Sequence, residues 1–309
     1  MHCNWLQWAG EIEYEVHGIV APMDTIDNRL PLLIHIGTQK AGSTYLYNLL
    51  TGHPDAGLST YTEVNFFSTR FEKGIDWYQN VFPPTGKPID CSPTYFKGGE
   101  SVAQRIKETY GAKSSELRFL LILRNPIDYV QSHFSMQRQQ DFFTKRSDLY
   151  PVPPDSLSVC ARMYPEYLKR GKYAELLEEW LRYFRRDQFL IVPFEWFVKN
   201  ESDAIAQILA FWGLPERTLT AAPVSHNKAL RFGILARLRD VVLSYPKLKS
   251  FLKGSRAFQY VLNHFLTAST KESITPQLRR ELSEVFAADV KKLSAHGVTT
   301  SYWKDFQNH

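Results

Sequence analysis

The chain has 309 residues, of which 44% are hydrophobic and 22% charged, a composition typical of a folded globular protein. Its 37 lysines and arginines exceed its 32 acidic residues by five, without the dense basic runs of a nucleic-acid-binding protein, so no nucleic-acid partner is expected. Cys3, Cys91 and Cys160 lie far apart without a Cys-x-x-Cys pair, which excludes a zinc motif and favours a reducing, cytoplasmic location. No signal peptide and no apolar run of about 18 residues is present, so we expect a soluble chain without a membrane span.

Strand-like and helix-like segments alternate along the chain after a poorly patterned leader, residues 1–30. Short apolar runs predict buried strands at 31–36, 117–123 and 188–192. Amphipathic spacing or a proline at the first turn predicts helices at 43–51, at 101–110, after Pro126 and at 173–184. Such alternation is typical of an α/β fold with a parallel sheet flanked by helices. The proline-rich segment 141–165 predicts a loop or lid, and the chain from 203 onward reads as mostly helical.

The sharpest motif joins the first predicted strand to its helix, Gly-Thr-Gln-Lys-Ala-Gly-Ser-Thr at 37–44. A tight turn at a helix N-terminus directs unpaired backbone N–H groups at an anion. The candidate phosphate-binding residues here are Lys40, Ala41, Gly42, Ser43 and Thr44. The ATP-binding loop G-x-x-x-x-G-K-[ST] has lysine directly after its second glycine, where this chain has Ser43, so we expect a P-loop-like site not built for Mg²⁺ and ATP. The alternative is an ordinary turn with Lys40 in solvent.

A second motif begins at the carboxyl end of the strongest predicted strand, with Arg124 followed eight residues later by Ser132. Ligands of open α/β sheets bind at that edge, and arginine grips phosphate with two parallel hydrogen bonds. The alternative is a salt bridge from Arg124 to Asp128 at the start of the helix.

Together the two motifs resemble the sulfotransferase family, which uses 3′-phosphoadenosine 5′-phosphosulfate (PAPS) and releases adenosine 3′,5′-bisphosphate (PAP). The resemblance implies that the loop with Lys40 binds the 5′-phosphosulfate, and that Arg124 and Ser132 bind the 3′-phosphate. It also implies a weaker match at Lys228 and Arg231, as basic residues closing over the 3′-phosphate; the alternative, which the pattern favours, is the solvent-exposed start of a helix.

Further segments are similar to the heparan sulfate branch of that family and its bacterial relatives. They are His53–Asp55, Glu63–Phe67, Asp76–Tyr78, Asp90–Phe96 and Phe286–Trp303. The likeness spans about 31–303, so we expect a leader at 1–30 and a single sulfotransferase domain at 31–309. The chain departs from the branch at Cys91, where lysine is usual, at Thr44, where 3-O-sulfating members have arginine, and at Asn65, where they have histidine. We therefore do not expect heparan as the acceptor.

Sulfuryl transfer depends on positioning and charge stabilisation, as phosphoryl transfer does. Lys40 is the candidate for stabilising the departing phosphate, and Glu63 is the candidate general base that the resemblance implies. The alternative is that Glu63 caps a turn or forms an ion pair on a surface loop. Asp90 precedes a Ser-Pro turn, which it would anchor, unless it orients the acceptor. The nine histidines form no metal motif, so we expect metal-independent chemistry.

These residues predict a transferase that moves a sulfuryl group from PAPS to a hydroxyl, less readily an amine, of a glycan, lipid or secondary metabolite. Two alternatives remain open: a nucleotide or small-molecule kinase on the same fold, and a non-catalytic protein that binds the nucleotide without turnover. The sequence names neither the acceptor nor the oligomeric state.

Overall fold

The computed structural model describes residues 29–217, 219 and 274–307, and the chain divides into two compact units. Within the described residues, the first unit takes in the chain up to Val130, the stretch that starts at Pro165, and the stretch that starts at Thr275. The second unit includes Gln131–Tyr164. The boundaries predicted for a single domain stay a prediction.

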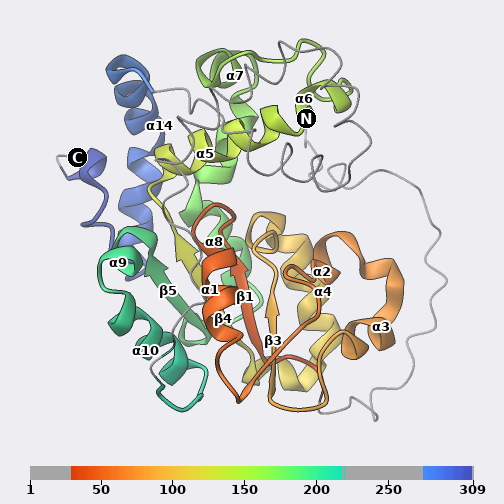
Figure 1. Ribbon diagram of the computed structural model, residues 1–309. Helices are drawn as coiled ribbons and strands as arrows, with labels where there is room; N and C mark the ends of the chain where they lie inside the picture. The colour runs from red at the N-terminus through yellow and green to blue at the C-terminus, as the bar shows by residue number, and fades with distance from the viewer. Residues whose placement is uncertain (1–28, 218, 220–273, 308–309) are drawn as a thin grey trace, which may run out of the picture. The chain divides into compact units, whose positions relative to one another are not determined.

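The first unit is built on one parallel sheet with the strand order β2-β3-β1-β4-β5 (Figure 1). The strands are β1 (Leu33–Gly37), β2 (Ala56–Leu58), β3 (Lys87–Cys91), β4 (Arg118–Leu123) and β5 (Phe189–Pro193). Because all five run in the same direction, their carboxyl ends meet at one edge. β1 lies in the middle of the sheet, with β3 on one side and β4 on the other. This edge is where open α/β sheets bind ligands.

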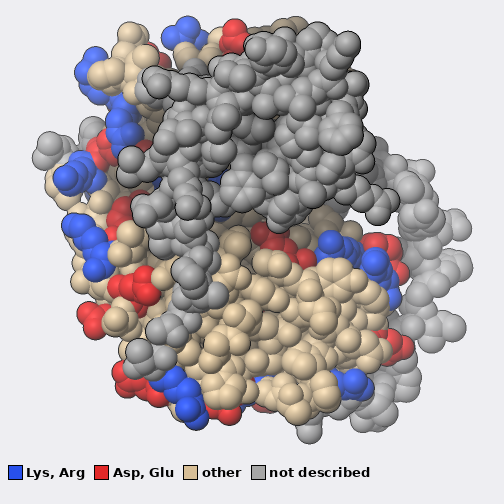
Figure 2. Space-filling model, viewed as in Figure 1, with Lys and Arg blue, Asp and Glu red and all other residues tan. Residues whose placement is uncertain are grey.

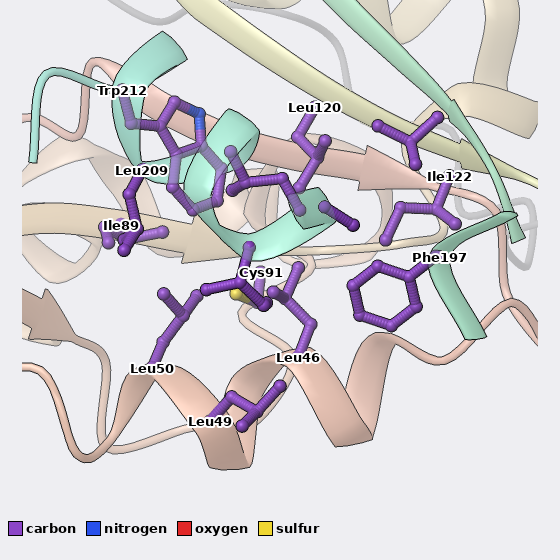
Figure 3. Close-up of a cluster of buried hydrophobic side chains, with 14 of the residues drawn as sticks. Leu46, Leu49, Leu50, Ile89, Cys91, Leu120, Ile122, Phe197, Leu209 and Trp212 are labelled. Carbon is purple, nitrogen blue, oxygen red and sulfur yellow. The ribbon is translucent and has the colours of Figure 1, made fainter. Parts of the chain in front are cut away.

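One face of the sheet is covered by α1 (Ser43–Leu50), α9 (Phe194–Lys199) and α10 (Glu201–Phe211) (Figure 1). Leu46, Leu49 and Leu50 of α1 are fully buried against strand residues of this face, and each such burial contributes about 1.5–3 kcal/mol. Cys91 lies in the same cluster, with its sulfur among these leucines (Figure 3). Gly52 and Pro54 follow α1 and end the helix once its apolar face is buried.

The opposite face is covered by α4 (Gly99–Tyr110) and α8 (Tyr173–Leu181), with α14 (Pro276–Ala295) against α8. The ring of Phe119 on β4 meets Trp180 of α8 edge-on at 5.5 Å, while its neighbour Leu120 points into the α1 cluster. Alternate residues of β4 thus bury apolar side chains on both faces, which is why the strand is a continuous hydrophobic run.

Shorter elements complete the first unit: α2 (Phe66–Thr69), η3 (Phe71–Lys73), α3 (Gly74–Asn80), η4 (Phe96–Gly98), η5 (Gly111–Glu116), η6 (Pro165–Gly171), η7 (Arg186–Gln188) and η8 (Lys304–Phe306). Helix α5 (Pro126–Gln139) starts in the first unit, and the second unit also contains α6 (Phe142–Lys145) and α7 (Leu157–Met163).

The predicted α/β class with a helix-flanked parallel sheet is confirmed, and each predicted strand or helix is present at closely similar bounds. The expectation of an irregular segment at 141–165 is wrong where α6 and α7 form, because two short apolar clusters there pack as helical turns. Its role as a lid stays a prediction. The helices expected between 220 and 273 lie outside the described residues.

Candidate active site

The loop between β1 and α1 forms a backbone cradle at the carboxyl edge of the sheet. Gly42 begins α1 with φ +85°, and no side chain caps the first turn of this helix. The first-turn N–H groups are therefore open to an anion, which the helix dipole also favours. A Cβ atom on Gly42 would lie 3.2 Å from the Phe194 ring, so glycine is required both by its φ and by this close approach. Lys40 is exposed and also has a positive φ of 64°.

Arg124 follows β4 and lies against this loop. Its NH1 donates to the carbonyl oxygen of Lys40 at 3.3 Å, and its guanidinium lies over the Phe194 ring, 5.4 Å from the centroid. In the part of the chain that the structure describes, no carboxylate pairs with Arg124; Asp128 binds Arg279 instead, at 3.0 Å. The alternative of an Arg124–Asp128 salt bridge is therefore wrong, and a positive group remains at the cradle.

The residue after Arg124 is held by a network that the sequence did not reveal. The backbone N–H of Asn125 donates to Glu195 at 2.9 Å, and its Nδ2 donates to Asp305 at 2.7 Å. The other oxygen of Glu195 accepts a hydrogen bond from the buried Trp303 indole at 2.9 Å. Segments 70 and 180 residues away along the chain thus fix the backbone that carries Arg124.

Glu63 follows β2 at the same edge of the sheet and is half-buried. Its Oε2 accepts a hydrogen bond from Asn65 Nδ2 at 3.3 Å, and Asn65 Oδ1 accepts from Thr94 at 2.7 Å. Arg70 NH1 donates to the Glu63 carbonyl oxygen at 3.1 Å. The carboxylate therefore has a defined orientation, and Asn65, in a left-handed conformation with φ 52°, is one of the groups that set it.

Asp90 at the end of β3 anchors this region from inside the protein. It is fully buried, and it accepts hydrogen bonds from the hydroxyls of Tyr78 at 2.8 Å, Tyr95 at 2.9 Å and Ser92 at 2.5 Å. Burial raises the pKa of Asp90 to about 6, although the three hydrogen bonds act in the opposite direction. Ser92 in turn accepts the backbone N–H of Asn65 at 2.8 Å. Of the two roles expected for Asp90, the geometry fits the anchor.

Lys97 of η4 joins the site without having been predicted for it. Its Nζ donates to Gln39 of the cradle at 3.2 Å, and its charge interacts with those of Glu63 and Arg170. The sequence signal was the position of Lys97 directly after the Asp90–Phe96 block, but the strand before that block went unrecognised because it begins with Lys-Pro.

The structure therefore brings the 37–44 loop together with Arg124, and Lys97 together with Glu63. Ser132 is half-buried on α5 within the second unit, and its contact with phosphate stays a prediction. Lys228 and Arg231 lie outside the described residues. Among the residues that the structure describes, no group of three or more His, Cys, Asp and Glu side chains is placed to hold a metal ion. No helix in those same ranges has both the length and the apolarity to cross a membrane.

The parallel sheet, the uncapped helix and the arginine at the strand edge define an α/β protein of P-loop-like architecture whose cradle suits an anion. The sulfotransferase domain family matches residues 31–294, and the chain belongs to this family. The resemblance found in its motifs is thereby confirmed.

Two relatives illustrate the similarity. Bifunctional heparan sulfate N-deacetylase/N-sulfotransferase 1 of Mus musculus is 28% identical over 240 residues, which are 73% of this chain and 26% of that protein. Heparan sulfate glucosamine 3-O-sulfotransferase 6 of Homo sapiens is 29% identical over 219 residues, 68% of this chain and 59% of that protein. The chain spans from a quarter to somewhat over half the length of these relatives.

The crystal structure of a sulfotransferase from Alicyclobacillus acidocaldarius has the same fold. It aligns with a TM-score of 0.61 and 18% sequence identity, covering 89% of this chain and 99% of that one.

Proposed function

We propose that this protein transfers a sulfuryl group from PAPS to a hydroxyl group of an acceptor and releases PAP. The observation that carries the proposal is the cradle at 37–44, with an uncapped α1 and a guanidinium at its rim, in a chain of the sulfotransferase domain family. The missing lysine after Gly42 argues against a kinase that binds Mg²⁺ and ATP.

The residues present fit an anionic donor. The N–H groups of the first α1 turn, which no side chain caps, and the exposed Lys40 side chain suit the 5′-phosphosulfate. Arg124, which no described carboxylate neutralises, suits the 3′-phosphate. The assignment of Ser132, Lys228 and Arg231 to the same phosphate rests on the family resemblance of their sequence positions.

PAPS, when bound, supplies an activated sulfuryl group. Glu63 accepts the proton of the attacking hydroxyl while the acceptor oxygen bonds to sulfur and the sulfur–oxygen bond to the 5′-phosphate breaks. Lys40 stabilises the negative charge that grows on the departing phosphate oxygen. Asn65 holds the Glu63 carboxylate during this proton transfer, at 3.3 Å.

We further propose that the acceptor is a glycan. Near Glu63 in the chain, Tyr61 is 42% exposed and its ring lies 5.7 Å from the Trp77 ring, an arrangement that suits stacking on a sugar. Arg70 lies over Tyr61 and Lys73 over Trp77, which adds positive charge to the same aromatic surface. In Figure 2, lysine and arginine side chains gather beside an uncharged area in the region of α2 and α3.

The direct test compares the thermal stability of the protein with PAP alone and with ATP and Mg²⁺. A ligand at 100 times its Kd adds about 2.7 kcal/mol to the free energy of unfolding. Stabilisation by PAP without metal supports the donor assignment, whereas stabilisation by ATP and Mg²⁺ alone would replace it with a kinase. PAP binding without release of PAP from PAPS on a broad panel of hydroxyl acceptors would indicate a non-catalytic protein.

Two variants then test the residues. Glu63→Gln should abolish turnover and leave PAP affinity nearly unchanged, whereas Arg124→Ala should weaken PAP binding. Glu72→Gln, at an exposed carboxylate of η3, is the matched control and should resemble the wild type in both assays. Turnover at the wild-type rate after Glu63→Gln would remove Glu63 as the base, and unchanged PAP affinity after Arg124→Ala would remove the 3′-phosphate assignment.

A further inference from the structure

Lys97 projects from a segment whose backbone is fixed from two sides. On one side, η4 packs so closely on the cradle that a Cβ atom on Gly37 would lie 2.8 Å from the Cβ of Phe96. On the other side, the carbonyl oxygen of Phe96 accepts a hydrogen bond from the buried Trp180 indole at 3.2 Å. The backbone that carries Lys97 is therefore held in place by packing and by a hydrogen bond on its neighbour Phe96.

The ammonium interacts with both the cradle and the candidate base. It donates to Gln39, the neighbour of Lys40 in the cradle, at 3.2 Å. The pKa of Lys97 is lowered to about 8, mainly by burial and also by the charge of Arg170 on η6, while the charge of Glu63 opposes both. Lys97 is thus protonated near neutral pH, yet less hydrated than a surface lysine, so its hydrogen bonds to an anion are strong.

The residues at the carboxyl end of the preceding strand, β3, bring no positive charge to the cradle. Cys91, the last residue of β3, is 3% exposed and directs its sulfur into the core beneath α1 (Figure 3). Burial also raises the pKa of the Cys91 thiol, which keeps it neutral. The neighbouring Asp90 is fully buried as well. Lys97 is therefore the side chain that brings charge from the β3–α4 connection to the cradle.

We propose that Lys97 is a second catalytic cation, which donates a hydrogen bond to the transferring sulfuryl group between the cradle and Glu63. The inference rests on the proposed sulfuryl transfer and divides the charge stabilisation between two lysines. Lys40 serves the departing phosphate oxygen, and Lys97 serves the equatorial sulfuryl oxygens. Lys97 keeps its proton throughout, since the proton of the acceptor hydroxyl passes to Glu63.

Three variants test this role: Lys97→Met, which removes the charge, Lys97→Arg, which keeps it, and Lys291→Met, an exposed control on α14. Lys97→Met should lower kcat by roughly 10²-fold, the scale for losing one electrostatic donor, with a change of less than about 3-fold in the Kd of PAP, which lacks the sulfuryl group. Lys291→Met should leave both quantities unchanged. A wild-type kcat after Lys97→Met would overturn the inference.

The pH profile separates this role from simple anchoring of Gln39. The kcat/KM for PAPS reports the protonation of the free enzyme, so it should fall as the pH rises through about 8 and Lys97 loses its proton. In Lys97→Arg the guanidinium stays protonated, and the fall should move to higher pH. Because Glu63, Arg170 and Lys40 surround the same position, an identical fall in wild type and Lys97→Arg would assign the titration to another group and overturn the inference.

A readout independent of turnover uses Glu63→Gln, which keeps PAPS intact, and amine acylation followed by mass spectrometry. PAPS should protect Lys97 from acylation more than PAP does, because only PAPS carries the sulfuryl group. Equal protection by both ligands would overturn the inference and leave the proposed function standing. A wild-type protein that neither binds PAP nor releases it from PAPS would refute the proposed function itself.

Discussion

Replacing Asp90 by asparagine should change how the stability of this protein depends on pH. The side chain is fully buried and receives three O–H donors, which an amide of the same shape can still largely satisfy. Its pKa rises from 3.8 to about 6 in the folded protein because of burial. Between these values the folded protein holds a proton that the unfolded chain has lost, so stability falls as the pH rises through this window.

The shift of about 2 units, at 1.36 kcal/mol each, amounts to ~3 kcal/mol in the free energy of unfolding. About 2 kcal/mol of this lies between pH 4.5 and 8, by the same linkage relation. Asp90→Asn lacks this titration, so its free energy of unfolding should rise by that amount relative to the wild type over the same interval.

The assay is urea denaturation of both proteins at several pH values, with Asp76→Asn, an exposed carboxylate on α3, as the matched control. Only the difference between variant and wild type matters, because the other titrating groups cancel in it. A difference that stays constant from pH 4.5 to 8 would refute the linkage argument, and with it the conclusion that burial raises the pKa of Asp90.

Three further predictions concern the same unit. Gly37→Ala should cost about 1–3 kcal/mol in stability and weaken PAP binding, because the new Cβ would meet Phe96 at 2.8 Å; calorimetry that shows neither effect would contradict this. Burial lowers the pKa of His35 to about 4, so the contribution of its neutral form to stability is complete above pH 6.5 and is lost as the pH falls. In denaturation curves the free energy of unfolding of His35→Gln should therefore fall by ~2 kcal/mol less than that of the wild type between pH 6.5 and 4.5. Arg279→Met removes the partly exposed ion pair to Asp305 at 2.6 Å. It should lower the free energy of unfolding by about 1–2 kcal/mol, and with it Tm, and it should also weaken PAP binding. A wild-type Tm would show that solvent screens the pair.

The predictable part of the fold was the part that repeats a simple physical pattern. β4 is a continuous apolar run because both of its faces are buried, and α1 starts at a glycine loop and ends before Gly52, so both were found within a residue or two. β2 and β3 were missed because they are short and contain glycine, lysine and proline. Their place in the sheet depends on pairing with β1, which no local pattern encodes.

The same division holds for the candidate site. The cradle and Arg124 were visible because a glycine turn and a strand end are local features. The orientation of Glu63 comes from its hydrogen bond with Asn65. The placement of Lys97 beside Gln39 depends on a contact between segments more than 30 residues apart, which local sequence does not specify. The sequence shows asparagine at 65 where relatives have histidine, and cysteine at 91 where lysine is usual. The structural effect of these two differences follows only from the packing of β3.

The contact of Asn125 with Asp305 also has a consequence for how the chain folds. These residues are 180 positions apart, so the loop that carries Arg124 cannot reach its final geometry until nearly all of the described chain has been synthesised. Closing so large a loop costs entropy before any contact compensates it. The β1–α1 cradle joins two elements that are adjacent in sequence, and its packing partners Phe96 and Phe194 are both synthesised before Asp305. During synthesis the site is therefore expected to mature in two stages, with the arginine at its rim fixed last.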